Sequence, residues 1–338
     1  MLNRRGRIFG GATHIMAALL ILVLIVPAAR GGQASDRKRS PLQLVRARQG
    51  DTPKTLARRY LKAASKGWMI AEYNGKDTFS EGEAVVIPGA VFRRGGLSPG
   101  GIQVVPVMAY GDIGDTAGQK HRRLSRVSRS AFHEQIRWLI DSGFTAISPD
   151  RLVAFMAFTS QLPRRSVLIT ADTESQRFYE DAAPILKAFG MTATVFVAPG
   201  RVGEKGDMSW DQIRTLSKEG FTIGCRGRYG RSLTRRKRGQ SFKENFSWIE
   251  SELKQGKKKI EAELGKPCRF LAYPEGRSDN LIAAMAANLG FSAAFNRSPG
   301  GTPFYADRFG IHRNVVDRRT DLDRFSDLLA TTIKVDLK

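Results

Sequence analysis

The end of one predicted strand carries two carboxylates separated by a threonine. The stretch VLITADTES, residues 167–175, begins with an apolar run typical of a buried strand and continues with Asp172, Thr173 and Glu174. In α/β proteins the residues that follow parallel strands meet at one edge of the sheet, where the chemistry usually takes place. A carboxylate at such an edge can act as a general base or bind a divalent cation.

Other polar side chains follow further predicted strands and could face the same edge: Asp112, Tyr273, Glu275 and His312. Carboxylates with one histidine can hold a divalent cation such as zinc, so a metal site is one interpretation. Histidine is scarce, because the chain has only His14, His121, His133 and His312. The alternative is structural: Asp172 and Glu174 stabilise the N-terminus of the following helix, and His312 is a partly buried histidine.

Arginines crowd one loop after another predicted strand, and they indicate an anionic partner. The chain of 338 residues has a net charge of +23, and this loop holds Arg226, Arg228, Arg231, Arg235 and Arg236. Guanidinium groups suit carboxylates and phosphates, so the loop predicts an anionic glycan site. A solvated basic loop is the alternative. Nucleic acid is not expected as a partner, because the basic runs lack interleaved aromatic residues that stack on bases.

Strands and helices alternate from residue 104 onward and define the fold class. Apolar runs such as SVLIT and TATVFVA are predicted strands, and the segments between them have apolar residues at helical spacing. This alternation gives parallel strands covered by helices. With roughly seven predicted strands, a closed (β/α) barrel is favoured over an open sheet.

The first 34 residues are predicted to direct export. Arg4, Arg5 and Arg7 precede an uncharged apolar run over residues 8–29, which is the pattern of a signal peptide, and cleavage after Ala34 fits it. The run is also long enough, at about 20 residues, to be a retained membrane anchor. Either interpretation exports the rest of the chain, which would face the periplasm from the inner membrane or be secreted into the cell envelope.

Residues 42–89 are predicted to form a small domain in the order strand, helix, helix, strand. LQLVRA alternates as a half-buried strand does, Thr52 and Pro53 begin a helix, and VVIP is the second strand. The segment resembles a LysM domain at Gly50, Asp51, Thr52, Leu56, Ala57, Asn74, Gly82, Ile87 and Pro88. The resemblance implies binding of chains that contain N-acetylglucosamine, notably peptidoglycan. A structural cap without a ligand is the alternative.

The larger domain resembles the polysaccharide deacetylase, or NodB-homology, family. The motifs that carry the resemblance lie within residues 104–316: VPVMAYGDIGD, VLITADTES, YEDAAPILKAFGMTATVFVAPGRVG, SWDQIRTLSKEGFTIG, FLAYPEG and RFGIHRNVV. The resemblance implies a distorted barrel of this family's type. It also implies a hydrolase that removes N-acetyl groups from polysaccharides, in which a divalent cation activates water.

The residues that bind the family's metal are replaced at the matching positions. In the family motif TFDDG the first aspartate is the base and the second is a metal ligand, and here these positions are Asp172 and Thr173. The two histidine ligands of the family's H-T-x-x-H correspond to Arg226 and Gly230. A threonine hydroxyl binds such cations poorly and an arginine repels them. We therefore expect no metal cofactor, unless a zinc site is rebuilt from Asp112, Asp172, Glu174 and His312.

Cys225 and Cys268 are predicted to be free and mostly buried thiols. They lie near the end of one parallel strand and near the start of another, which would place them at opposite ends of the barrel. A disulfide needs Cα atoms within about 7 Å of each other.

Together these patterns predict an exported envelope protein that binds glycan or peptidoglycan without deacetylating it. Two alternatives stay open: an active metal-dependent N-deacetylase with a displaced site, and a basic nucleic-acid-binding protein. The predicted segments are a leader or anchor at 1–34, a linker at 35–41, the LysM-like domain at 42–89, a linker at 90–103 and the barrel at 104–338.

Overall fold

The computed structural model describes residues 42–89, 94–98, 100–114, 126–235 and 238–335, which all belong to the compact unit Ser40–Lys338. The predicted leader and first linker lie outside the described residues. None of the described helices has the length and apolar character needed to cross a membrane.

The segment from residue 42 to residue 88 is a two-stranded antiparallel ladder with helices between its strands. Leu42 pairs with Pro88 at one end of the ladder, and Arg46 pairs with Ala84 at the other. Its elements follow the order that the sequence pattern predicts: β1 (Leu42–Arg46), α1 (Pro53–Leu61), η1 (Ala64–Lys66), α2 (Gly67–Asn74) and β2 (Ala84–Pro88).

Local interactions explain several residues of the small segment. The Thr52 side chain caps α1 by accepting a hydrogen bond from the Thr55 amide at 3.2 Å. Asp51 is buried, and its carboxylate accepts hydrogen bonds from Nη2 and Nη1 of Arg59 at 2.7 and 2.9 Å. The Asn74 side chain joins α2 to β2 through the Val86 amide and carbonyl, at 2.9 and 2.8 Å. These contacts account for the fold of the segment, and its ligand stays a prediction.

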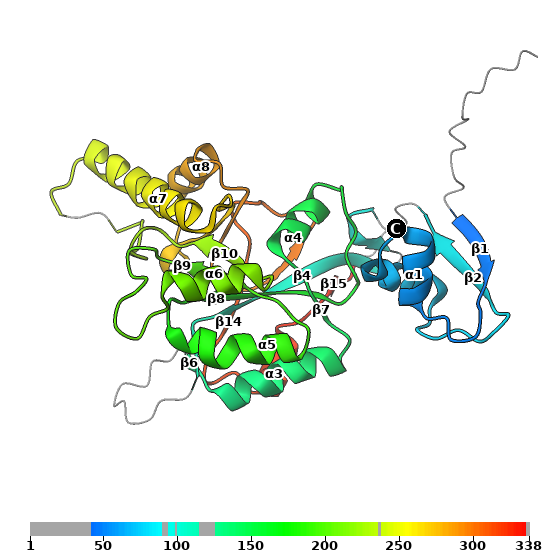
Figure 1. Cartoon of the computed structure of the whole chain (residues 1–338). Coiled ribbons are helices and arrows are strands. Elements are labelled where there is room, and N and C mark those ends of the chain that lie inside the picture. The colour runs from blue at the N-terminus through cyan, green and yellow to red at the C-terminus, as the bar shows by residue number, and fades with distance from the viewer. Residues whose placement is uncertain (1–41, 90–93, 99, 115–125, 236–237, 336–338) are drawn as a thin grey trace, which may run out of the picture. The chain divides into compact units, whose positions relative to one another are not determined.

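A curled parallel sheet forms the centre of the larger part (Figure 1). Its strands lie in the order β12–β11–β10–β9–β8–β4, and β14 pairs with the free side of β4. Ile311, just before β14, bridges Phe295 at the end of β12, so the sheet curls towards closure. The predicted distorted barrel is confirmed. The strands are β4 (Gly101–Tyr110), β8 (Ser166–Asp172), β9 (Thr194–Val197), β10 (Thr222–Cys225), β11 (Phe270–Ala272), β12 (Ala293–Phe295) and β14 (Asn314–Val316).

Short strands extend the sheet at its margins. Three of them run antiparallel to the amino-terminal half of β4: β3 (Leu97–Ser98), β13 (Gly301–Pro303) and β15 (Thr332–Ile333). β7 (Thr145–Ala146) pairs with the start of β8, and β5 (Asp112–Ile113) pairs with β6 (Arg126–Val127). The pairs of β3, β13, β15 and β7 lie at the amino-terminal halves of β4 and β8, whereas the β5–β6 pair follows the carboxyl end of β4.

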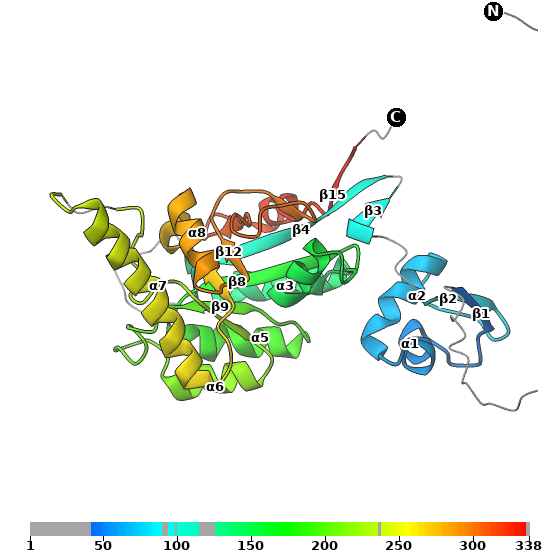
Figure 2. The same cartoon turned by 90° about the horizontal axis from the view of Figure 1, so that it is seen from above.

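Helices cover the outside of the curled sheet, as Figures 1 and 2 show. Most begin with a serine or aspartate side chain that accepts a hydrogen bond from the first turn, among them Ser128, Ser209 and Asp279. The helices are α3 (Arg129–Asp141), α4 (Pro149–Met156), α5 (Ala183–Ala188) preceded by the π-helical turn η3 (Phe178–Ala182), α6 (Trp210–Lys218), α7 (Phe242–Leu264), α8 (Asn280–Asn288) and α9 (Leu322–Asp327), with 3-10 turns η2 (Arg94–Gly96) and η4 (Pro274–Gly276).

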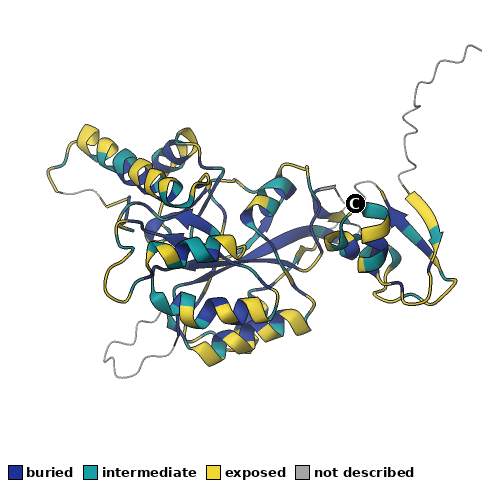
Figure 3. Ribbon diagram, viewed as in Figure 1, coloured by how far each residue is buried: buried dark blue, intermediate teal, exposed yellow. Residues whose placement is uncertain are grey.

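Alternate residues of the strands divide the core into two layers. Val107 of β4 and Phe196 of β9 face one apolar cluster, whereas Met108 and Val195 face the other. The cluster with Phe196 fills the barrel interior, and the cluster with Val195 packs under the helices. Figure 3 shows the sheet as buried and the outer helix faces as exposed. A filled barrel leaves its strand ends as the place for a binding site.

The two cysteines are free and buried, as predicted. Their expected placement at opposite ends of the barrel is wrong, because the thiols are close enough to affect each other's ionisation. Cys268 precedes Leu271, the residue paired with Cys225, by a short stretch of chain. Burial raises the pKa of the Cys225 thiol well above its usual value and that of Cys268 to about 12.

Both thiols should therefore resist a disulfide-exchange reagent in the native protein. We expect no labelling by Ellman's reagent at pH 8 until denaturant is added, and then two thiols per chain, because the thiolate is the reactive form. Absorbance at the reagent's product band gives the count. Rapid labelling of native protein would contradict the buried placement.

Candidate functional site at the carboxyl end of the barrel

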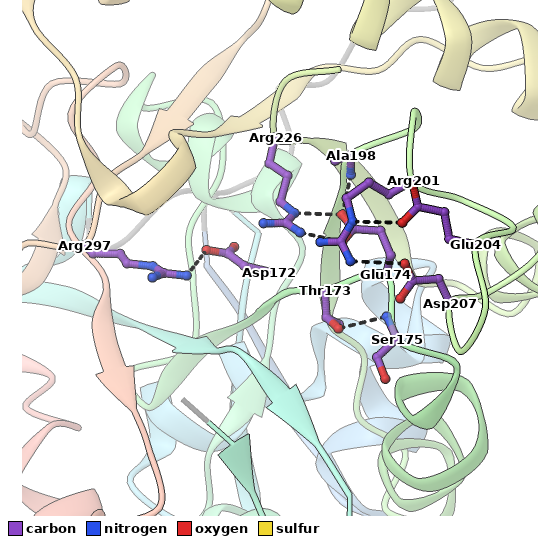
Figure 4. Close-up of polar contacts among 10 residues, drawn as sticks. All are labelled: Asp172, Thr173, Glu174, Ser175, Ala198, Arg201, Glu204, Asp207, Arg226 and Arg297. Atoms are coloured by element: carbon purple, nitrogen blue, oxygen red, sulfur yellow. Dashed lines mark hydrogen bonds and ion pairs between the residues drawn. The ribbon is translucent and has the colours of Figure 1, made fainter. Parts of the chain in front are cut away.

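Two loops bring the key residues together above strand β9. Asp172 ends β8 and lies beside Phe196 of β9, and the Thr173 amide donates to the Phe196 carbonyl at 3.2 Å. On the other side of β9, the Arg226 amide donates to the Val197 carbonyl at 3.0 Å. The loops after β8 and β10 therefore meet at one end of the barrel (Figure 4).

Asp172 is held by two arginines from the C-terminal part of the chain. Its carboxylate accepts hydrogen bonds from Arg313 Nη1 and Nη2, at 2.6 and 2.9 Å, and from Arg297 Nη2, at 2.9 Å. The side chain is 4% exposed. Burial alone would raise the pKa of the Asp172 carboxyl, but the charge and hydrogen bonds of Arg313, with Arg297 and Arg226, lower it to about 2. Asp172 is consequently an ionised, weakly basic carboxylate at neutral pH.

Arg313 is one of three site arginines, with Arg201 and Arg297, that sequence reasoning missed, although its neighbour His312 was singled out. Arg313 is fully buried and its Nε donates to the Asn296 carbonyl at 2.8 Å. His312 is exposed, with its Nδ1 beside Gly300, so the interpretation as a partly buried histidine is wrong. Neighbouring residues of an extended segment point in opposite directions. That alternation, applied to FGIHRNVV, would have favoured Arg313.

Glu174 forms a second buried ion pair, with Arg226. One carboxylate oxygen accepts hydrogen bonds from Arg226 Nε at 2.7 Å and from the Ala198 amide at 2.5 Å. The other oxygen accepts a hydrogen bond from Arg226 Nη2. Arg201 Nη1 lies 3.5 Å from that second oxygen. The exposed fractions are 2% for the Glu174 side chain and 17% for Arg226. Burial lowers the pKa of the Arg226 guanidinium, but the bond to Glu174 outweighs this and raises the pKa above its usual value.

The guanidinium of Arg226 takes the space next to Gly230. A Cβ atom placed on Gly230 would lie 3.2 Å from Arg226 Nη1 and 3.3 Å from its Cζ. Gly230 also has a φ of 66°, which side chains other than glycine adopt with strain. A larger side chain at position 230 would therefore require the Arg226 guanidinium to shift by a few tenths of an ångström.

The remaining position with an implied metal ligand is Thr173, which is buried. Its hydroxyl accepts a hydrogen bond from the Ser175 amide at 3.0 Å and closes a local turn. The three positions thus provide a hydroxyl, a guanidinium and a glycine, a set that does not fit a divalent cation. Across the described parts of the chain, no three His, Cys, Asp or Glu side chains are grouped so that they could hold a metal ion.

The other candidate residues are not assembled around Asp172. Asp112 pairs with Arg126 at 2.6 Å. Tyr273 is buried and donates to the Phe309 carbonyl at 2.8 Å, and burial raises the pKa of its phenol well above the usual range. Glu275 is exposed and lies 3.2 Å from Arg235. The structure gives each of these residues a different partner, so it does not assemble the predicted displaced metal site.

Among the described arginines of the predicted basic loop, Arg226 alone enters the site. Arg228 bonds to Gln255, and both Arg228 and Arg231 lie over the ring of Tyr229, with centroid distances of 4.9 and 5.3 Å. Arg235 pairs with Glu275, and Arg236 lies outside the described residues. The site instead gains Arg201, Arg297 and Arg313, which belong to other loops.

Solved structures of other proteins share the fold of this barrel. A deacetylase of Streptococcus pyogenes, PplD, solved in complex with acetate, superposes with a TM-score of 0.61 at 18% identity, covering 68% of this chain and 99% of that one. IcaB from Ammonifex degensii superposes with a TM-score of 0.58 at 22% identity, covering 68% and 98%. At these identities the likeness establishes the shared fold.

Sequence comparison gives the family. Residues 159–294 match the polysaccharide deacetylase family. YxkH of Bacillus subtilis (strain 168) is 24% identical over 188 residues, which are 56% of this chain and 64% of that relative. The poly-beta-1,6-N-acetyl-D-glucosamine N-deacetylase of Staphylococcus aureus (strain MRSA252) is 26% identical over 196 residues, 55% of this chain and 67% of the relative. The chain therefore contains a polysaccharide deacetylase domain, and it spans less than two thirds of the length of YxkH.

Proposed function

We propose that this protein binds an envelope glycan through its deacetylase-type barrel and does not deacetylate it. The observation that carries the proposal is the Arg226 guanidinium, which is bonded to Glu174 and packed against Gly230. The two positions where the family resemblance implies histidine ligands are Arg226, which carries a positive charge, and Gly230, which has no side chain. A divalent cation would be repelled from this place.

The aspartate at the base position supports the same proposal. Bulk water has a pKa of about 15.7, and a bound metal lowers it to about 7 in enzymes that use one. Asp172 has a pKa of about 2 and is already engaged by Arg313 and Arg297. Such a carboxylate is too weak a base to activate water unaided.

The polymer is proposed from the relatives and from the small N-terminal segment. The staphylococcal relative is named for poly-β-1,6-N-acetyl-D-glucosamine. The LysM-like pattern of residues 42–89 favours peptidoglycan or another chain that contains N-acetylglucosamine. Export through residues 1–34, by a cleaved signal or a retained anchor, would place both parts in the envelope with these polymers.

Metal analysis paired with an acetate assay tests whether the domain is catalytic. We expect substoichiometric zinc in purified protein, and no acetate release from peptidoglycan or poly-N-acetylglucosamine above a heat-inactivated sample. The staphylococcal N-deacetylase serves as the positive control. Stoichiometric zinc, or acetate release that a chelator abolishes, would show that a metal-dependent deacetylase is the correct function.

Binding is tested separately, by sedimentation with insoluble peptidoglycan. The protein should pellet with the polymer and be displaced by soluble fragments of it. A chain that stays in the supernatant at physiological salt, and that binds DNA under the same conditions, would replace the glycan proposal by the nucleic-acid alternative.

A further inference from the structure

Two arginines at the barrel mouth keep hydrogen-bonding capacity that the protein does not use. Within the described part of the chain, Nε of Arg297 is buried and has no hydrogen-bond partner. Arg226 binds Glu174 through Nε and Nη2, and Nη1 takes part in none of the hydrogen bonds found among the described residues. Arg313, by contrast, uses all three of its nitrogens. A buried guanidinium donor without an acceptor is unfavourable, so a small shift of Arg297 that lets a ligand oxygen reach Nε would be favoured.

The two arginines flank the same carboxylate. Arg297 bonds to Asp172 directly, and the charge of Arg226 contributes to the lowered pKa of Asp172. Figure 4 shows Asp172 between the two guanidinium groups. Both side chains keep contact with solvent, because Arg226 is 17% and Arg297 is 35% exposed. They are therefore close together and accessible to a ligand.

The positive charge around Asp172 is in excess only locally. Arg226, Arg297 and Arg313 lie against the carboxylates of Asp172 and Glu174, so three positive charges face two negative ones. The adjoining network of Arg201, Asp207 and Glu204 adds one net negative charge, and its Asp207 side chain is 13% exposed. A guanidinium in a partly buried place attracts an anion more strongly than one in open solvent.

We propose that this mouth binds a single anionic group of the ligand, a carboxylate or a phosphate, on the solvent-facing sides of Arg226 and Arg297, next to Asp172. The proposal rests on the proposed function and names the chemistry of its ligand. Guanidinium forks match both groups in geometry, and charge-assisted hydrogen bonds are shorter and stronger than neutral ones. The replacements at the implied metal positions act together: Thr173 carries no charge and Arg226 adds a positive one. A place suited to a cation becomes a place suited to an anion.

Calorimetric titration with small probes tests the proposal and separates the two sources of the anionic group. Glucuronate presents a sugar carboxylate, glucose 6-phosphate presents a sugar phosphate, and glucose is the neutral match. We expect at least one charged sugar to bind and glucose to give no heat. Arg297→Ala should weaken that binding by about tenfold or more, as the loss of a charge-assisted bond implies. Asp172 keeps the fork of Arg313 in this variant, so the fold should be retained.

Arg137→Ala is the matched control, since it removes one positive charge from an exposed pair with Asp141 on α3. It should leave the affinity unchanged. Absence of binding by both charged sugars, equal binding of glucose, or an Arg297→Ala affinity equal to that of the parent would overturn the anion site. If the protein then still sediments with peptidoglycan and lacks zinc, the proposed function stands without it. Stoichiometric zinc with intact anion binding would overturn the proposed function alone.

Discussion

Replacing Asp172 by asparagine is expected to lower the free energy of unfolding by about 3 to 5 kcal/mol, the usual cost of breaking a buried ion pair. Arg313 is fully buried, and Asp172 is its charged partner through two hydrogen bonds of 2.6 and 2.9 Å. Asparagine has nearly the same shape, so the loss reports the uncompensated charge rather than a cavity. Denaturant unfolding at pH 7, followed by tryptophan fluorescence, measures it.

The same variant should lose part of the acid sensitivity of the fold. The pKa of Asp172 falls from an ordinary 3.8 to about 2 in the folded protein. A folded-state pKa below the unfolded value means that ionised Asp172 stabilises the fold. That contribution, about 2 to 3 kcal/mol, is complete above pH of about 4 and is lost as the pH falls towards 2. Asp172→Asn should flatten the stability profile in this window.

Asp141→Asn is a suitable control for the Asp172 experiment. Asp141 pairs with Arg137 at 3.6 Å and both side chains are largely exposed. Such surface pairs contribute about 0 to 1 kcal/mol, so this variant should be nearly neutral. If Asp172→Asn were equally neutral at pH 7, the pair with Arg313 would not stabilise the fold as we infer.

The periodicity of the sequence predicts most of the barrel, because parallel strands and covering helices each leave a local pattern. The strand pairs at the amino half of β4 leave no such pattern. β13 and β15 are only a few residues long. β13 is defined by its pairing with residues 104–106 of β4, and β15 by its pairing with residues 102–103, rather than by their own composition. Short strands of this kind depend on tertiary pairing and cannot be seen in propensity.

The sequence singled out Asp172, Glu174 and Arg226, and it did not single out Arg201, Arg297 or Arg313. Asp172 and Glu174 follow a strand with a clear apolar run. Their partners Arg297, Arg313 and Arg226 come from loops far along the chain, and only barrel closure brings them together. Among many arginines, nothing in local sequence distinguishes the few that are buried. The alternation of the extended segment FGIHRNVV was a usable signal for Arg313, whereas His312 was chosen as a possible metal ligand.

The pair of Glu174 and Arg226 gives the second large effect. Arg226→Met should destabilise the fold by about 3 to 5 kcal/mol, because the Glu174 carboxylate is 2% exposed and loses its fork. The double variant Glu174→Gln and Arg226→Met removes both charges and keeps an acceptor for the Ala198 amide. It should be more stable than Arg226→Met alone, with a coupling energy of about 1 to 3 kcal/mol in the double-mutant cycle.

The exposed pair of Arg137 and Asp141, taken through the same cycle, should give a coupling within about 0.5 kcal/mol of zero. Additive effects at Glu174 and Arg226 would contradict a shared buried pair. The same ion pair limits which residues position 226 can accept. Changing Arg226 to the histidine that the family resemblance implies leaves Glu174 buried without its partner, and a histidine at Gly230 also meets a φ of 66°. Arg226→His is therefore expected to destabilise the fold unless Glu174 changes as well.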